Sequence, residues 1–233
     1  MNTIVTGASK GIGKATAEAF AKLGSNLFLC ARNQHNLKVL KDQLEERNPS
    51  IEVHIFATDL SEKENVYEFA RQITSLTEQV NVLINNAGYF KPGEMLKQTD
   101  NESEYTMNLN FWSAFYLTKA LVPFMRKEAG HIFNICSVAS LKAYPKSGIY
   151  STSKYALLGF TKALRQDLSS THIRVTAVHP GPTWSDSWSG VDLPEDRLMP
   201  AHAVADSIVA AHQLPTNTVL EELILRPQLG DLL

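Results

Sequence analysis

Short apolar runs alternate with longer amphipathic segments along the whole chain, and this alternation restricts the available folds. Strands that are separated by helices pair in parallel, with helices on the faces of the sheet. The sequence therefore predicts an α/β fold with a doubly wound, seven-stranded parallel sheet. The predicted strands are Thr3–Val5, Asn26–Cys30, Ile51–Ala57, Val80–Ile84, His131–Cys136, Ile173–Val178 and Leu220–Leu225, and the predicted helices are Gly11–Leu23, Gln34–Arg47, Glu62–Leu76, Glu102–Lys127, Tyr150–Leu168 and Ala201–His212.

The composition favours one domain that binds a small molecule. The 233 residues are 44% hydrophobic, and no linker or repeat divides them, so residues 1–233 are predicted to form a single domain. The net charge is only -2, and no basic block recommends nucleic acid or a membrane surface as partner. Cys30 and Cys136 suit a reducing compartment, and no signal peptide or long apolar stretch is evident. We expect a cytoplasmic protein.

A glycine-rich turn follows the first predicted strand and suits a phosphate group. It reads T-G-A-S-K-G-I-G from Thr6 to Gly13. Glycines let the backbone approach a pyrophosphate, and the next helix presents unpaired amides and the positive end of its dipole. An ordinary glycine-rich turn is the alternative, but the position directly after a strand favours a cofactor site. The residues expected at the cofactor are Gly7, Ser9, Lys10, Gly11, Ile12 and Gly13.

The end of the second predicted strand favours a cofactor with a 2′-phosphate. NAD-type sites usually offer a carboxylate about 20 residues past the glycines, but the chain reads C-A-R-N from Cys30 to Asn33. Arg32 can pair with a 2′-phosphate, and Lys10 can add a second positive charge. We therefore expect NADP(H) in preference to NAD(H), with two solvated surface cations as the alternative.

The third and fourth strand ends supply further candidate contacts to the cofactor. Asp59, followed by Leu60, can place a carboxylate at the adenine edge, or it can cap the next helix. The N-N-A-G sequence at Asn85 to Gly88 would let a ribose or nicotinamide lie close to the backbone, although it is also typical of a turn. Asn86, Ala87 and Gly88 are the predicted contacts there.

Tyr150 and Lys154 are spaced to act together. Residues four apart on a helix share a face, and a neighbouring ammonium favours the phenolate and lowers the pKa of a phenol. Tyr150 is then a candidate general acid or base. The same spacing also arises on helices where a tyrosine and a lysine stem form only a half-buried surface.

These motifs, with Ser137 and Pro180-Gly181, resemble the classical short-chain dehydrogenase/reductase family over essentially the whole chain. The resemblance implies a Rossmann fold, a nicotinamide cofactor, and a homodimer or homotetramer, to which the long apolar helices carrying Asn110 and Tyr150 are suited. It implies hydride transfer between the nicotinamide and a carbonyl or secondary alcohol. The implied tetrad is Asn110, with Asn108 as the fallback, Ser137, Tyr150 and Lys154.

The resemblance also assigns roles within this tetrad. Tyr150 would exchange a proton with the substrate oxygen, and Ser137 would orient that oxygen. Lys154 would lower the pKa of Tyr150 and bind the ribose, while Asn110 would hold a water that connects Lys154 to solvent. The substrate itself cannot be predicted from these residues.

The segment after the sixth predicted strand should border the nicotinamide and the substrate. Pro180, Gly181 and Thr183 are expected near the cofactor, with Ser185 as an alternative to Thr183. Residues 183–200 are predicted to form a short substrate loop. Its aromatic side chains can line an apolar pocket or anchor the loop; the expected pocket residues are Tyr89, Phe90, Tyr144, Trp184 and Trp188.

Two alternative functions stay open, and no metal site is expected. A non-catalytic NADP(H)-binding regulator can share the fold, but it has no need for the Ser137, Tyr150 and Lys154 set. A sugar epimerase or dehydratase of the extended branch also uses a tyrosine and lysine, but it usually carries an added domain. The histidines show no metal-ligand spacing, so no metal is expected, and His179 is predicted to pack at a strand end.

Overall fold

All seven strands pair in parallel in one sheet. The computed structural model describes residues 1–125, 129–184 and 192–231, and the strand order is β3-β2-β1-β4-β5-β6-β7. The order reverses between β1 and β4, which confirms the predicted doubly wound sheet. The strands are β1 (Asn2–Thr6), β2 (Asn26–Ala31), β3 (Val53–Ala57), β4 (Val82–Asn85), β5 (His131–Ile135), β6 (Arg174–Pro180) and β7 (Glu222–Leu225).

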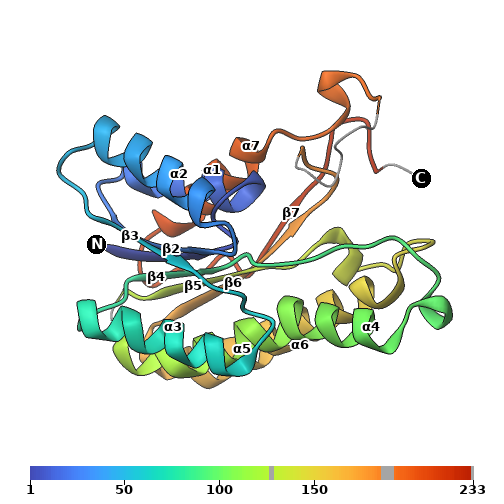
Figure 1. Cartoon of the computed structure of the whole chain (residues 1–233), viewed down its shortest axis with the longest axis horizontal. Helices are drawn as coiled ribbons and strands as arrows, with labels where there is room; N and C mark the ends of the chain where they lie inside the picture. Colours follow the sequence, from blue (N-terminus) through green and yellow to red (C-terminus); the bar gives the residue numbers. More distant parts are fainter. Residues whose placement is uncertain (126–128, 185–191, 232–233) are drawn as a thin grey trace.

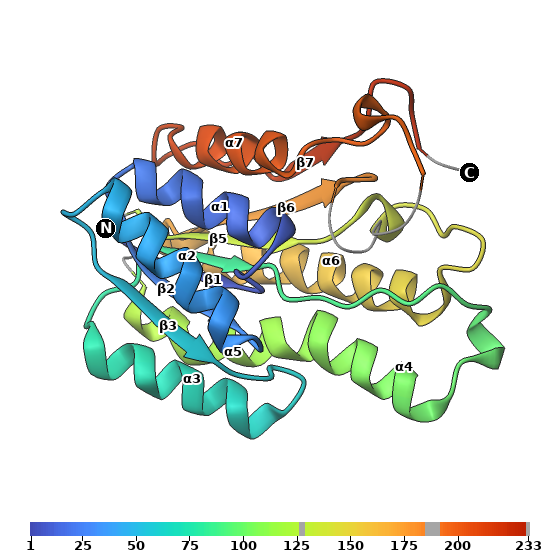
Figure 2. The ribbon, with the colours of Figure 1, turned by 45° about the horizontal axis from the view of Figure 1, so that its top comes forward.

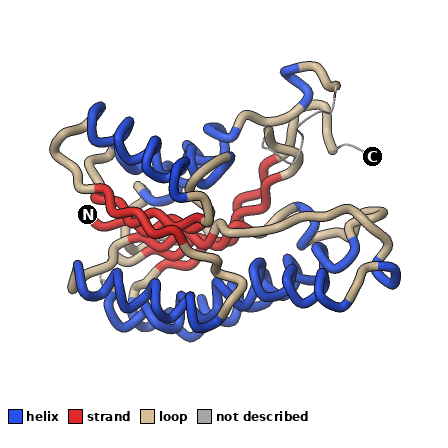
Figure 3. Tube along the Cα trace, viewed as in Figure 1, coloured by secondary structure: helices blue, strands red, loops and turns tan. Residues whose placement is uncertain are grey.

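Helices cover both faces of the sheet, so the fold has three layers. Figure 1 shows α1 (Gly11–Lys22), α2 (Gln34–Arg47) and α7 (Ala201–His212) on one face, and α3 (Lys63–Leu76), α4 (Asp100–Met107), α5 (Ser113–Leu121) and α6 (Gly148–Leu168) on the other. The turned view separates the two sets (Figure 2), and the strands form the middle layer (Figure 3). Every residue of β4, β5 and β6 is buried, as expected for parallel strands that are covered on both sides. None of the helices among the described residues is long and apolar enough to cross a bilayer.

The fourth predicted helix differs most from the prediction. Thr99 starts α4 earlier than expected, because its hydroxyl accepts from the Glu102 amide and the Glu102 carboxylate accepts from the Thr99 amide. The helix widens into a π-helical segment, Asn108–Trp112, and its α-helical part ends at Leu121. Pro123 cannot continue the helix because it lacks an amide hydrogen, so a 3₁₀ turn follows over Val122–Phe124. The predicted end at Lys127 lies outside the described residues.

Gly13 brings α1 into direct contact with the two loops that follow β1 and β4. A Cβ atom at Gly13 would lie 2.2 Å from the Gly7 carbonyl oxygen and 2.4 Å from the Asn86 side-chain nitrogen. Both distances are far below van der Waals contact. Only glycine therefore allows the helix to approach this closely.

Substitution Gly13→Ala should destabilise the protein by about 1–3 kcal/mol, because the backbone of the glycine-rich turn has to move. Gly159→Ala is the matched control, since Gly159 lies in α6 and an added Cβ would have nothing within 4 Å. It should leave stability unchanged or raise it by up to about 1 kcal/mol through helix propensity. Urea unfolding of the two variants measures both effects, and equal stability would contradict the close approach.

Two histidines and an arginine pack together at the amino ends of β5 and β6; His131 and Arg174 are buried, and His212 is half-buried. The rings of His131 and His212 lie 5.8 Å apart, and His212 also packs on Phe20 at 5.5 Å. Arg174 donates from its guanidinium to backbone carbonyls at the end of α7, including the His212 carbonyl at 2.9 Å. Burial, assisted by the Arg174 charge, lowers the pKa of His212 to about 4 and lowers that of His131 well below its ordinary value. Both rings are therefore held neutral.

These rings should make the protein sensitive to acid. Below pH ~6.5 each histidine is protonated in the unfolded chain but stays neutral in the folded protein. The free energy of unfolding therefore falls as the pH drops from this value towards the folded pKa, by up to about 1.4 kcal/mol per pH unit for each such histidine. Substitution His212→Phe keeps a ring against Phe20 and removes the titration. The unfolding free energy of this variant should therefore fall less steeply than that of the wild type between pH 6.5 and 5. Parallel curves would show that His212 does not contribute.

Candidate active site

A cleft of about 780 Å³ opens where the carboxyl ends of the strands meet. Its walls come from the loops after β1, β2, β3, β4, β5 and β6, together with the start of α6. The reversal of strand order between β1 and β4 lies at its centre, where open α/β sheets bind their ligands. The cleft is therefore the position at which a dinucleotide would be expected.

Almost all of the predicted site residues line this one cleft. The exceptions are Gly13, which packs against Gly7 and Asn86, and Asn110, which is buried with 1% of its surface exposed. The predicted residues that line the cleft are Gly7, Ser9, Lys10, Gly11, Ile12, Arg32, Asp59, Leu60, Asn86, Ala87, Gly88, Ser137, Tyr150, Lys154, Pro180, Gly181 and Thr183.

The floor of the cleft is held by hydrogen bonds between the ends of β1 and β4. The Thr6 hydroxyl accepts from the backbone amides of Asn86 and Ala87, both at 2.9 Å. The Asn86 side chain donates in return to the carbonyl oxygens of Thr6 and Gly7, at 2.9 and 3.2 Å. Gly7 and Gly11 take positive φ angles of 63° and 54°, which a glycine adopts without strain. The turn is thus fixed close to the N-N-A-G segment.

Arg32 follows β2 and Asp59 follows β3. These two strands lie at the opposite end of the sheet from β6 and β7. The Arg32 guanidinium is exposed and donates to the Tyr105 hydroxyl at 2.7 Å. Asp59 accepts from the Ser61 amide at 3.0 Å, whereas α3 begins after Glu62. Asp59 therefore stabilises a local turn and is not the cap of α3, so the capping alternative for Asp59 is wrong.

Ser137, Tyr150 and Lys154 meet at the junction of β5 and α6. Ser137 lies two residues after β5 in an extended conformation, and its hydroxyl accepts from the Ala139 amide at 3.1 Å. Lys154 is buried with 4% exposed; its Nζ donates to the Ile135 carbonyl at 2.7 Å and lies 5.8 Å from the centre of the Tyr150 ring. Phe90 packs edge-on against that ring at 4.9 Å. The three polar groups are thus held in place by the strand, the helix and an aromatic contact.

Burial has the largest effect on the pKa values of Tyr150 and Lys154. Burial raises the pKa of Tyr150 above its ordinary value, and a hydrogen bond from Ser137 opposes this shift. Burial also lowers the pKa of Lys154 to about 8. Desolvation has the larger influence on the phenol, and the ammonium donates to a backbone carbonyl, so the lowering of the Tyr150 pKa by Lys154 stays a prediction.

The π-helical segment turns Asn110 towards the site. Its side-chain oxygen accepts from the Tyr89 amide at 2.7 Å, and its nitrogen donates to the Tyr89 carbonyl at 3.0 Å and to the Ser153 hydroxyl at 2.9 Å. A Cβ atom at Gly88 would lie 3.5 Å from Asn110 Oδ1 and 3.6 Å from Lys154 Nζ. Asn110 therefore approaches Lys154 beside a glycine, whereas the fallback Asn108 is only half-buried.

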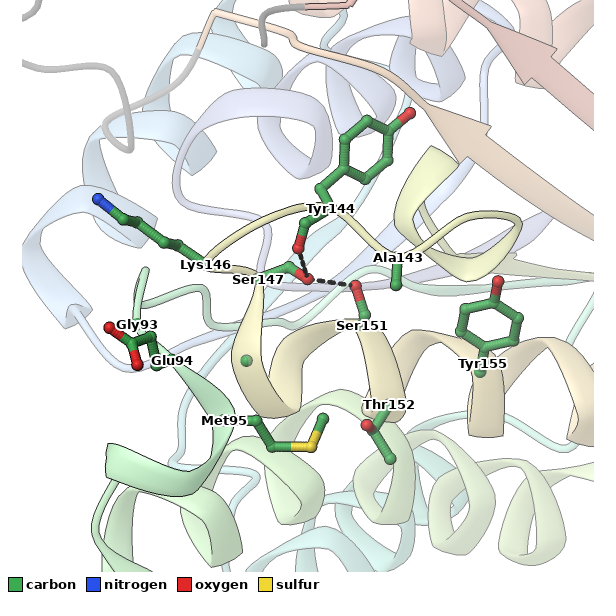
Figure 4. Close-up of a pocket in the computed structure, with 11 residues that line it drawn as sticks. Gly93, Glu94, Met95, Ala143, Tyr144, Lys146, Ser147, Ser151, Thr152 and Tyr155 are labelled. Carbon is green, nitrogen blue, oxygen red and sulfur yellow. Dashed lines mark hydrogen bonds between the residues drawn. The ribbon is translucent and has the colours of Figure 1, made fainter.

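A second hollow, of about 400 Å³, lies on the other side of the loop before α6. Figure 4 shows how this loop is anchored: the Ser147 hydroxyl donates to the Tyr144 carbonyl at 2.6 Å, and the Ser151 hydroxyl donates to Ser147 at 2.8 Å. These bonds fix Tyr144, which borders both hollows, relative to the helix that carries Tyr150. The loop therefore belongs to the frame of the cleft.

The expected aromatic lining is found only in part. Tyr89, Phe90 and Tyr144 line the cleft, but Trp184, although it is among the described residues, does not. Thr183 donates to the Gly181 carbonyl at 2.9 Å. The alternative contact Ser185 and the predicted pocket residue Trp188 lie outside the described residues.

Asp231 reaches the cleft without having been predicted. Its carboxylate accepts from the Tyr144 hydroxyl and pairs with Arg226, and Arg197 donates to its backbone carbonyl at 3.1 Å. Its buried Oδ1 would lie 3.4 Å from a Cβ at Gly181. No sequence signal marks this residue, because its position depends on how the chain returns after β7.

The sequence matches the short chain dehydrogenase family over residues 1–195. The sepiapterin reductase of Chlorobaculum tepidum is 35% identical over 238 residues, which cover 98% of this chain and 97% of that protein. Human estradiol 17-beta-dehydrogenase 11 is 34% identical over 181 residues, covering 76% of this chain and 60% of that protein.

Solved structures give the same assignment. The L-sorbose reductase of Gluconobacter frateurii, complexed with NADPH and L-sorbose, has a TM-score of 0.89 at 26% identity and covers 97% of this chain and 95% of its own. A short-chain dehydrogenase of Sphingobium yanoikuyae in complex with NADPH has a TM-score of 0.84 at 30% identity. The match covers 98% of this chain and 88% of that one. Because the family match spans most of the sequence, the chain belongs to the short chain dehydrogenase family of oxidoreductases.

Proposed function

We propose that this oxidoreductase uses NADP(H) to interconvert a carbonyl and a secondary alcohol on a small molecule. The observation that carries the proposal is the meeting of Ser137, Tyr150 and Lys154 in a cleft whose opposite wall is the glycine-rich turn. The site is suited to NADP(H): the glycine-rich turn lines the cleft at the start of α1, where a helix amino end favours a phosphate, and Arg32 lines the same cleft as a positive charge.

When bound, the nicotinamide supplies or accepts the hydride. In the reductive direction Tyr150 would donate its phenolic proton to the oxygen of the substrate, and Ser137 would hold that oxygen by a hydrogen bond. A phenol whose pKa is raised is protonated at neutral pH, so it is ready to act as the acid. Lys154 would contact the ribose, and Asn110 would support proton resupply through its neighbours Ser153 and Tyr89.

The relatives support carbonyl chemistry and guide the choice of substrates. One is named a sepiapterin reductase, and a structural neighbour is an L-sorbose reductase. We therefore propose that the substrate is a small polar carbonyl compound, and sepiapterin is the first compound to assay. The intact Ser137, Tyr150 and Lys154 set counts against the non-catalytic regulator.

We further propose that residues 1–233 act as one cytoplasmic unit that assembles into a homodimer or homotetramer. The substrate loop would lie near 183–200. The aromatic side chains of Phe111, Trp112 and Phe115 gather on α5 and the π-helical segment before it, and Trp112 is 38% exposed, which supports an interface there. Cys30 and Cys136 are free and buried, which fits a reducing compartment.

Replacing Tyr150 by Phe should lower turnover by about 10²- to 10⁴-fold, because the ring stays and only the transferable proton is lost. Tyr155→Phe is the matched control, since Tyr155 lies on the same helix with 45% exposed and outside the cleft. Its turnover should stay near that of the wild type. Steady-state assays on a carbonyl panel with NADPH measure both variants. Wild-type turnover by Tyr150→Phe would refute the role of Tyr150.

Replacing Arg32 by Ala should weaken NADPH binding by about 10- to 100-fold, the loss expected for a charge-assisted pair with a phosphate. NADH binding should change little, because NADH lacks the 2′-phosphate. Tyr105→Phe removes the present hydrogen-bond partner of Arg32 and keeps the guanidinium, so NADPH should bind it almost as tightly as the wild type. Fluorescence titrations with both cofactors give the result. Equal losses for NADPH and NADH in Arg32→Ala would exclude Arg32 as the selector.

A further inference from the structure

His179 is a fully buried histidine that lies directly behind Ser137. It stands near the end of β6, with none of its surface exposed. Its Nδ1 atom lies 2.9 Å from the Ser140 hydroxyl and 3.1 Å from the Ser137 carbonyl oxygen. Ser137 directly precedes the short 3₁₀ turn Val138–Ser140, and Ser140 is its last residue. The imidazole therefore contacts both ends of this turn.

The hydrogen bonds around this turn define which atom of His179 carries the proton. The Ser137 carbonyl can only accept, and the Ser140 hydroxyl donates to the same carbonyl. The Ser137 amide donates in turn to Ser140 at 3.3 Å. A hydrogen on Nδ1 of His179 therefore satisfies both oxygens, whereas a bare Nδ1 would set a lone pair against the carbonyl.

The other ring nitrogen, Nε2, is buried and has no hydrogen-bond partner among the described residues, although a carboxylate lies nearby. His179 Nε2 lies 3.3 Å from Glu222 Oε2, and Glu222 Oε1 lies 3.0 Å from Lys162 Nζ. Glu222 belongs to β7 and Lys162 to α6, so these two elements border the ring on the side away from the turn, and Nδ1 is the atom that bonds the turn. Simple packing at a strand end would not need the contacts of Nδ1 with Ser137 and Ser140, because an apolar side chain fills such a position without the cost of burying hydrogen-bonding atoms.

We propose that His179 is a positioning residue that sets the orientation of the Ser137 hydroxyl through the 3₁₀ turn. The inference rests on the proposed function, in which Ser137 binds the substrate oxygen. The hydroxyl accepts from the Ala139 amide within the same turn, so a shift of the turn moves the hydroxyl relative to Tyr150. Loss of the imidazole leaves the buried Ser137 carbonyl and the Ser140 hydroxyl without one partner each, which favours such a shift.

The decisive experiment compares three replacements of buried histidines. His179→Leu removes the donor, and His179→Asn places an amide donor where Nδ1 lies. His131→Leu is the control, because His131 is also fully buried on the neighbouring β5 but bonds Thr176 at 2.9 Å, away from the cleft. The kcat of His179→Leu should fall by about 10- to 100-fold, the scale expected for a misplaced catalytic group. His179→Asn should recover most of this loss, and His131→Leu should keep the wild-type kcat.

Two further readouts separate positioning from loss of folding. The KM for NADPH should stay within about threefold in His179→Leu, while the isotope effect on kcat with NADPH deuterated at C4 should increase, because the chemical step becomes slower. Ser140→Ala should lower kcat in the wild type and have little further effect in His179→Leu, as expected for residues that act as a unit. Additive losses, or failure of His179→Asn to recover activity in a folded protein, would overturn the proposal.

The same experiments separate this inference from the proposed function. If the wild type reduces a carbonyl compound and Tyr150→Phe does not, the proposed function stands, and an unchanged kcat in His179→Leu rejects the role of His179 alone. If the wild type reduces no compound of the panel and does not bind NADPH, the proposed function fails, and the positioning role fails with it.

Discussion

Parallel pairing of all seven strands is the constraint on which the rest of this structure depends. Because the strands are parallel, the chain has to cross back along the sheet after each strand before it starts the next. These crossovers contain the helices, which cover both faces of the sheet. The carboxyl ends of the strands are thereby collected at one edge. Six loops that are distant in the sequence meet there and form one cleft. The position of the site follows from the pairing before any side chain is considered.

Burying polar groups behind this edge has an energetic cost that the fold offsets with hydrogen bonds. The Asn85 side chain donates to Asn134 at 2.8 Å and to Thr118 at 3.0 Å, and Asn134 donates to Thr161 at 2.8 Å. This network connects β4 and β5 to α5 and α6 at the base of the site. Each amide is paired, and a network of this kind stabilises only when its members are satisfied. The helices that carry the proposed catalytic groups are thus tied to the sheet.

The electrostatics of the site arise from the same burial. Lys154 is surrounded by protein and offers its ammonium to a single carbonyl, so its pKa falls to about 8. Tyr150 responds in the opposite direction, because desolvation penalises the phenolate as it penalises the ammonium. Both groups are shifted towards their neutral forms. At the substrate end, Tyr144, Arg226 and Asp231 connect the loop before α6 to the returning chain, so the last described residues contribute to the wall of the cleft.

The sequence alone determined the sheet, its helices and most of the candidate site. Hydrophobic periodicity reports local burial, and Gly7, Gly11 and Tyr150 with Lys154 lie in short segments whose geometry is local. Only the tertiary structure decided the orientation of Asn110 in the π-helical segment and the need for glycine at position 13. It also placed His179 beside Ser137, and Asp231 beside Gly181. These features depend on contacts between segments that are far apart in the chain. No local pattern encodes them, because the partner that gives each residue its role is supplied by packing.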